Sequence, residues 1–155
     1  MNQATTTIIS HSPDQTFNLG RQFASQVQPG TAICLIGDLG AGKTQFVKGF
    51  AKGLGIPQTI TSSTFLLFQQ YTLPPKTDDY TNKNSNLYLN HLDLYRVDGD
   101  PLALGFDLLE LITDNQYTLI EWADHLADYL PGGSMEIHFS YIDDQTRQII
   151  HPPLE

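Results

Sequence analysis

Eight residues in the first third of the chain have the types and spacing of a phosphate-binding loop. They are Gly37, Asp38, Leu39, Gly40, Ala41, Gly42, Lys43 and Thr44, which fit G-x-x-x-x-G-K-[ST], the P-loop pattern. Glycines let the backbone curl so that successive N–H groups converge on one anion. The lysine supplies a mobile positive charge for the outer phosphates, and the threonine hydroxyl can ligate Mg²⁺. The pattern therefore predicts a site for the phosphates of a nucleotide.

The residues on either side predict the strand and the helix that a P-loop needs. Residues 31–36 are apolar and rich in branched side chains, which is typical of a buried strand. A helix that begins near Lys43 would add its free N–H groups and the positive end of its dipole to the loop. This context separates the stretch from a chance glycine-rich turn. The helix is predicted from apolar residues that recur at helical spacing: Phe46, Val47, Phe50, Ala51 and Leu54.

Two predicted strands end in carboxylates that could complete the site. Residues 87–93 end at Asp93, and residues 117–121 end at Glu121. Open α/β sheets place ligands at the carboxyl ends of their strands, so both acids would lie on the side of the P-loop. Either could complete the metal shell that Thr44 begins and order an attacking water. For each acid the alternative is an ordinary strand-end carboxylate that caps a helix.

Three neighbouring residues are weaker candidates. Asp38, inside the loop, could contact water or metal. His91 would share the strand face of Asp93 and could hydrogen-bond near the site, although a structural histidine is the simpler interpretation. Trp122 could pack against a nucleotide base, a partner or the core. The five histidines show no metal-ligand spacing, and the sequence holds no Ser-His-Asp or Cys-His nucleophile set.

The other patterns predict one α/β domain over residues 1–155. A helix should start after Ser12 as the N-cap, with Pro13 first and Gln15 closing a capping box, and should end before Pro29. Residues 72–86 lack apolar periodicity and predict a long solvated loop. The last two strands should form a C-terminal hairpin. Further strands are predicted at residues 5–10, 65–71, 135–142 and 146–150, and further helices at 102–112 and 122–130.

Charge and composition limit the kinds of partner. The net charge is −9, and the only arginines are Arg21, Arg96 and Arg147. Strong direct binding to nucleic acid needs clustered basic residues, so a basic protein partner suits this surface better. Cys34 is the only cysteine and is predicted to be a buried core residue. No signal peptide or membrane-spanning run is apparent, which predicts a cytoplasmic protein.

Four motifs occur in an order that resembles a known family. They are residues 37–44, Ser62-Ser-Thr-Phe65, His91-Leu-Asp-Leu-Tyr-Arg96 and Ile120-Glu-Trp122. The chain resembles the TsaE (YjeE-like) family, small P-loop ATPases of bacterial tRNA threonylcarbamoyladenosine biosynthesis. Ser63 departs from the family pattern, which usually has proline there. The long polar loop before Leu87 is a second departure.

The resemblance implies a P-loop NTPase-like three-layer α/β fold, with a mostly parallel central sheet, antiparallel additions and a C-terminal hairpin. It implies ATP and Mg²⁺ as cofactors, with Thr44 and Glu121 as metal ligands and Asp93, Glu121 and Lys43 as catalytic residues. The partners would be TsaB-like and TsaD-like protein subunits, and tRNA would be met only through their complex. ATP turnover would reset that complex between rounds of threonylcarbamoyl transfer to the tRNA adenosine beside the anticodon.

Two other functions share this set of residues. A small-molecule kinase would also use a P-loop, but it should carry several arginines in a lid over the phosphates. Residues 72–86, the longest predicted loop, contain no arginine. A non-hydrolysing adaptor gated by nucleotide would need the same residues as a slow ATPase, so the sequence leaves that alternative open.

Overall fold

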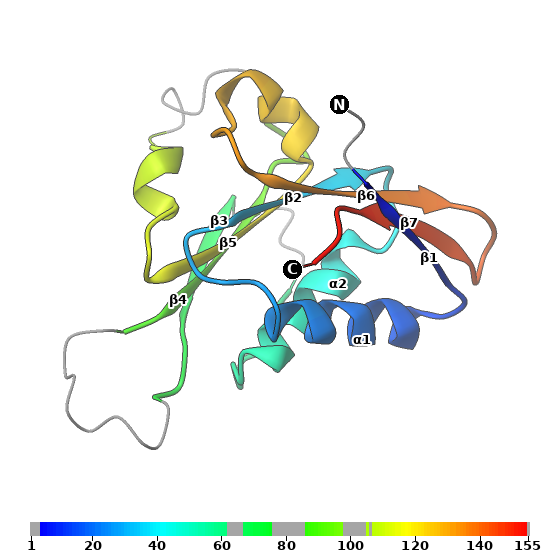
Figure 1. Ribbon diagram of the computed structural model, residues 1–155, viewed down its shortest axis with the longest axis horizontal. Helices are drawn as coiled ribbons and strands as arrows, with labels where there is room; N and C mark the ends of the chain where they lie inside the picture. Colours follow the sequence, from blue (N-terminus) through cyan, green and yellow to red (C-terminus); the bar gives the residue numbers. More distant parts are fainter. Residues whose placement is uncertain (1–3, 62–66, 76–85, 98–104, 106, 155) are drawn as a thin grey trace.

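A mixed β-sheet forms the centre of the structure, a computed structural model that describes residues 4–61, 67–75, 86–97, 105 and 107–154 (Figure 1). In these residues seven strands share one sheet, in the order β1-β7-β6-β2-β5-β4-β3. Their bounds are Thr6–Ser10 (β1), Ala32–Gly37 (β2), Phe68–Thr72 (β3), Tyr88–Asp93 (β4), Gln116–Glu121 (β5), Met135–Tyr141 (β6) and Arg147–His151 (β7).

The direction of the strands positions the site. β6, β2, β5 and β4 are parallel neighbours, while β3 on one side and β7 and β1 on the other pair antiparallel. The expected α/β fold with antiparallel additions and a β6–β7 hairpin is confirmed. Because the carboxyl ends of parallel strands meet at one edge, the P-loop after β2 lies beside the ends of β4 and β5.

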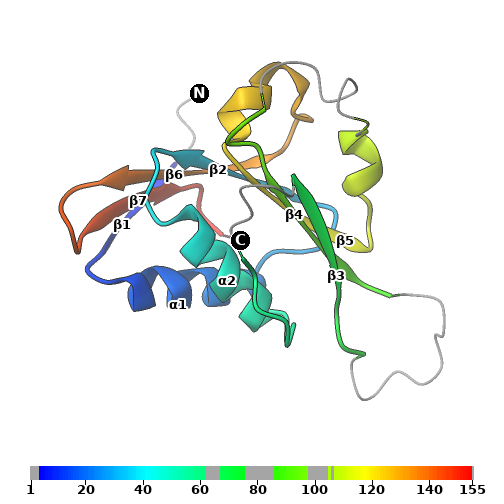
Figure 2. The same cartoon turned by 180° about the vertical axis from the view of Figure 1, so that it is seen from behind.

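Helices cover both faces of this sheet. α1 (Pro13–Ala24) and α2 (Lys43–Gly53) pack on one face, and the 3₁₀ helices η2 (Leu108–Leu111) and η3 (Ala123–Tyr129) lie on the other (Figures 1 and 2). Each face buries its own apolar cluster, one containing Phe46 and Leu119 and the other containing Cys34 and Ile120. None of the helices in the described ranges combines the length and apolarity needed to cross a bilayer.

Glycines allow α1 and α2 to approach closely. A Cβ on Gly49 would lie 1.8 Å from the Phe17 carbonyl oxygen, and one on Gly20 would lie 2.1 Å from that of Phe46. Only residues without a side chain tolerate such contact between backbones. The close crossing holds the start of α2, and with it the P-loop, firmly against α1.

The start of α1 follows the predicted capping pattern with one difference. The Ser12 hydroxyl accepts the Gln15 N–H at 3.2 Å, as an N-cap should. The Gln15 amide oxygen accepts the N–H of His11 at 2.7 Å, not that of Ser12. The helix also ends at Ala24, several residues before Pro29.

Other boundaries differ from the sequence expectations. The helix expected at 122–130 is the 3₁₀ helix η3, with a kink at Leu126. The described part of the helix expected at 102–112 is η2, which starts after Asp107 because that carboxylate accepts the Leu109 N–H at 3.0 Å. The strand expected from residue 65 is seen from Phe68. Residues 62–66, most of the 72–86 loop (76–85), 98–104 and 106 lie outside the described residues.

Candidate nucleotide-binding site

The loop between β2 and α2 has a backbone that curls as a P-loop must. Gly40 and Gly42 have φ values of 76° and 103°, in the left-handed region that favours glycine. Gly42 is also the N-cap of α2, and a Cβ there would meet Thr16 Cγ2 at 3.3 Å. The N–H groups of the first helical turn, which begins at Lys43, have no partner within the helix. The curl and the helix start together form a cradle for an anion.

Lys43 is buried beside this cradle. The residue is 4% exposed, and its Nζ donates to the carbonyl oxygens of Gly37 and of Asp38, the latter at 2.8 Å. Nζ also lies 4.0 Å from the centre of the Trp122 ring. Burial lowers the pKa of Lys43 from its ordinary 10.5, and the charge of Glu121 is the largest influence in the opposite direction. These direct contacts are all with uncharged groups, so the ammonium would gain from a bound anion.

Trp122 reaches Lys43 because of an unusual backbone turn. It has a φ of 57°, the single positive value among the described residues other than glycine. The turn follows directly on β5 and places the indole beside Lys43, with the Tyr95 ring at 5.0 Å and the His125 ring at 5.6 Å between centroids. Trp122 lines the cavity and also packs, partly buried, against the apolar cluster that contains Cys34 and Ile120, so the structure supports a core contact as well as a place at the cavity.

The two predicted metal ligands are in direct contact. Thr44 Oγ1 donates to the two carboxylate oxygens of Glu121 at 3.0 and 2.9 Å. Glu121 is 2% exposed, and its Oε1 lies 2.9 Å from Nε2 of His91, which is 3% exposed. A hydroxyl beside a carboxylate is the donor set that a hard divalent cation prefers, so the residues present fit Mg²⁺. Within the described ranges no three His, Cys, Asp or Glu residues gather as a metal site, and a P-loop ion draws its other ligands from phosphate and water.

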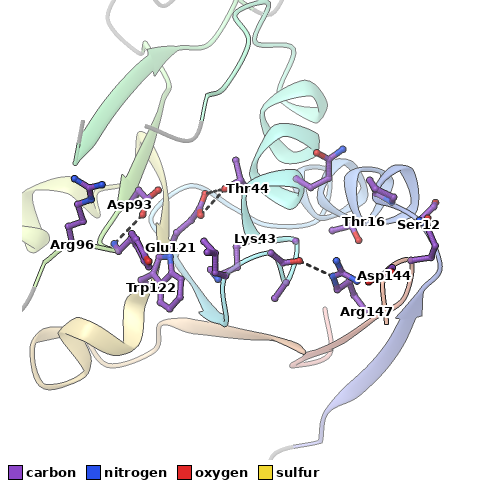
Figure 3. Close-up of a pocket in the computed structure, with 18 of the residues that line it drawn as sticks. Ser12, Thr16, Lys43, Thr44, Asp93, Arg96, Glu121, Trp122, Asp144 and Arg147 are labelled. Carbon is purple, nitrogen blue, oxygen red and sulfur yellow. Dashed lines mark hydrogen bonds between the residues drawn. The ribbon is translucent and has the colours of Figure 1, made fainter. Parts of the chain in front are cut away.

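Asp93 lies next to Glu121 in the sheet, since the two residues are partners in the β4–β5 register. Asp93 Oδ1 accepts the N–H of Tyr95 at 3.1 Å, which fixes one oxygen of the carboxylate. The side chain is half-buried and lines the same cavity as Glu121 (Figure 3). The structure thus brings both strand-end acids to the P-loop.

A cavity of about 400 Å³ lies over the loop, a size typical of small-molecule sites. Leu39, Gly40, Ala41, Gly42, Lys43 and Thr44 line it, with both predicted acids. Gly37 and Asp38 do not line it, and their carbonyls hold Lys43 instead. Arg96 and Trp122 border the cavity on the side of the acids, while Ser12, Thr16, Asp144 and Arg147 border it on the other side (Figure 3).

Sequence reasoning did not find the second group of lining residues. Ser12 was recognised only as a helix cap, and Arg147 only as one of three arginines. Arg147 Nε donates to the carbonyl oxygen of Gly40 at 3.0 Å, across 107 positions of sequence. The predicted hairpin was the one available signal, because a hairpin packed beside β2 brings its tip to the P-loop.

Comparisons with known proteins identify a family. A family model described as "Threonylcarbamoyl adenosine biosynthesis protein TsaE" matches residues 10–149. The Bacillus subtilis protein named "tRNA threonylcarbamoyladenosine biosynthesis protein TsaE" is 34% identical over 138 residues, which are 89% of this chain and 79% of that protein. The chain belongs to the TsaE family. A TsaE relative from Nostoc is also 34% identical, over 92% of this chain and 83% of the relative.

A solved structure extends the match to the fold. The crystal structure of Bacillus subtilis YdiB superposes with a TM-score of 0.70 and 29% identity, covering all of this chain and 89% of that one. The TsaE match spans the P-loop, both acids and Arg147. Every residue that lines the cavity therefore lies within residues 10–149, the segment that the family model matches.

Proposed function

We propose that this TsaE-family chain binds ATP with Mg²⁺ at residues 37–44 and hydrolyses it slowly in the biosynthesis of threonylcarbamoyladenosine on tRNA. The observation that carries the proposal is that buried Lys43 and the hydrogen-bonded Thr44 and Glu121 line the same cavity. A buried cation held by uncharged groups favours a polyanion, and the adjacent oxygens favour a divalent cation.

Each side chain would have a separate task. Lys43 would leave the Gly37 and Asp38 carbonyls for the outer phosphates, with Trp122 closing its other side. Thr44 and Glu121 would hold Mg²⁺, which when bound neutralises charge on the phosphates. Asp93, whose carboxylate is already fixed by the Tyr95 N–H, would orient the attacking water and take its proton.

Partner proteins would explain why turnover is slow in isolation. We assign TsaB-like and TsaD-like subunits as those partners, with tRNA reached only through them. The net charge of −9 supports docking to protein in preference to the tRNA backbone. A partner that supplies a missing group to the transition state raises the rate of such an ATPase by orders of magnitude.

Two measurements test the proposal. Calorimetry should show ATP binding that strengthens with Mg²⁺ and weakens in Lys43→Ala, because the phosphates lose a buried counter-charge. Phosphate release should be slow for the chain alone and faster with both partner subunits. Binding with background phosphate release even in the full complex would instead identify a nucleotide-gated adaptor, and phosphate transfer to a small molecule would identify a kinase.

A further inference from the structure

The cavity has two chemically different ends. Asp93, Glu121 and Trp122 lie on one side of the P-loop, and Arg147 and Asp144 of the β6–β7 hairpin lie on the other (Figure 3). Under the proposed function, the outer phosphates and the reaction belong at the acidic end. The terminal phosphate and the base lie at opposite ends of ATP, so the nucleoside would extend along the loop toward the hairpin.

Arg147 is the cation at the hairpin end, and several contacts hold it in place. Nε donates to the Gly40 carbonyl oxygen at 3.0 Å, and Nη1 donates to the carbonyl oxygens of Thr146, at 3.0 Å, and Asp143. The guanidinium carbon lies 4.5 Å from the centre of the Tyr141 ring. These bonds fix the guanidinium plane before any ligand arrives, which lowers the entropic cost of binding.

The hairpin itself is built to keep this arrangement. The Tyr141 hydroxyl donates to the Asp144 carboxylate, and Asp143 Oδ1 accepts the N–H groups of Gln145 and Thr146 at 2.9 and 2.8 Å. The turn is therefore stiff, and the ring that supports Arg147 is tied to it. One face of the guanidinium lies on the Tyr141 ring, and Arg147 also lines the cavity, so this supported group is within reach of a ligand bound there.

We propose that the Arg147 guanidinium, held between Gly40 and the Tyr141 ring, is the surface on which the base of the bound nucleotide stacks. This inference rests on the proposed function and assigns the nucleoside end of the same site. A flat guanidinium stacks well on any base and needs no particular pattern of hydrogen bonds. The Nε bond to Gly40 holds the guanidinium beside the phosphate loop, where the base of a bound nucleotide would lie.

The test compares ATP with inorganic tripolyphosphate, which carries the same phosphates without a nucleoside. Calorimetry at fixed Mg²⁺ would measure both ligands for the unsubstituted chain, Arg147→Ala and Arg147→Lys. Loss of a stacked base is expected to weaken ATP binding about tenfold or more in both variants and to leave tripolyphosphate affinity within about twofold. Arg147→Lys should not rescue binding, because it keeps the charge and loses the plane. Arg21→Ala, which removes an exposed arginine from the last turn of α1, is the matched control.

A second variant tests whether the loss of ATP binding comes only from a disturbed phosphate loop. Tyr141→Leu removes the supporting ring and its hydroxyl bond to Asp144 but neither partner of the Arg147–Gly40 bond, and should weaken ATP alone by about two- to fivefold. Equal losses for ATP and tripolyphosphate in Arg147→Ala and Arg147→Lys would overturn the inference, since Arg147 would then act on phosphate. Unchanged ATP affinity in Arg147→Ala would overturn the stacking inference and leave the proposed function standing. If the unsubstituted chain does not bind ATP at all, both the proposed function and the stacking inference are overturned.

Discussion

Replacing Glu121 separates its structural role from its chemical one. Glu121→Ala removes the acceptor of both Thr44 and His91. His91 is 3% exposed, so its ring nitrogen would be left unpaired at a cost of about 1–3 kcal/mol. The half-buried Thr44 hydroxyl can turn to water in the cavity and loses less. We therefore expect Glu121→Ala to lower the free energy of unfolding by about 2–3 kcal/mol. Glu121→Gln keeps an acceptor oxygen of the same shape and should lose about 1 kcal/mol or less.

Urea unfolding without nucleotide measures the structural part of this prediction, and ATP calorimetry with and without Mg²⁺ measures the chemical part. Both variants should lose the strengthening of ATP binding by Mg²⁺, because an amide oxygen carries no charge for the ion. Equal destabilisation of the Gln and Ala variants would refute the argument that acceptor geometry holds His91. A Gln variant that kept the full Mg²⁺ effect would refute Glu121 as a metal ligand.

Three further predictions concern the parts that hold the site. Gly49→Ala should destabilise the chain by about 1–3 kcal/mol or more in thermal unfolding, because its Cβ would lie 1.8 Å from the Phe17 carbonyl oxygen. Gly132→Ala is the control, because a Cβ there meets nothing within 4 Å. Burial raises the pKa of Cys34 to about 12, so thiol reagents should label it only after unfolding, and rapid labelling of the native chain would contradict its burial. The pKa of Lys43 in the folded chain is lowered from 10.5, so the unfolded chain binds this proton more tightly. The difference in the free energy of unfolding between the unsubstituted chain and Lys43→Met should therefore shift in favour of the unsubstituted chain as pH rises toward 10.5. A difference that stays constant with pH would contradict this prediction.

The glycine-rich loop between β2 and α2 and the positions of the two acids could be predicted from the sequence because their signals are local. A glycine pattern, a buried strand before it and apolar spacing after it are all contained within about 25 residues. The positions of Asp93 and Glu121 followed from one further rule, that parallel strands deliver their carboxyl ends to a common edge. Their register as partners in β4 and β5 agrees with that reasoning.

The remaining parts depend on contacts between distant segments. The residues around Arg147 in the sequence do not predict its hydrogen bond to Gly40. That contact arises only when β7 pairs with β6 and β6 pairs with β2. His91 was expected either to hydrogen-bond near the site or to be structural, and its partner, Glu121, is set by the β4–β5 pairing. Helix type was also missed at η3, where Trp122 in the left-handed region and the kink at Leu126 interrupt regular α geometry.

The register of β5 ties the core to the site. Leu119 belongs to the apolar cluster beneath α1 and α2, while Ile120 belongs to the cluster beneath η3. Glu121 shares the face of Leu119, since side chains alternate along a strand, and so it meets Thr44 at the start of α2. A slip of one residue would turn Glu121 into the cluster of Cys34 and Ile120, where a carboxylate has no partner and costs several kcal/mol. The packing that stabilises the sheet therefore also excludes the register in which Thr44 and Glu121 would be apart.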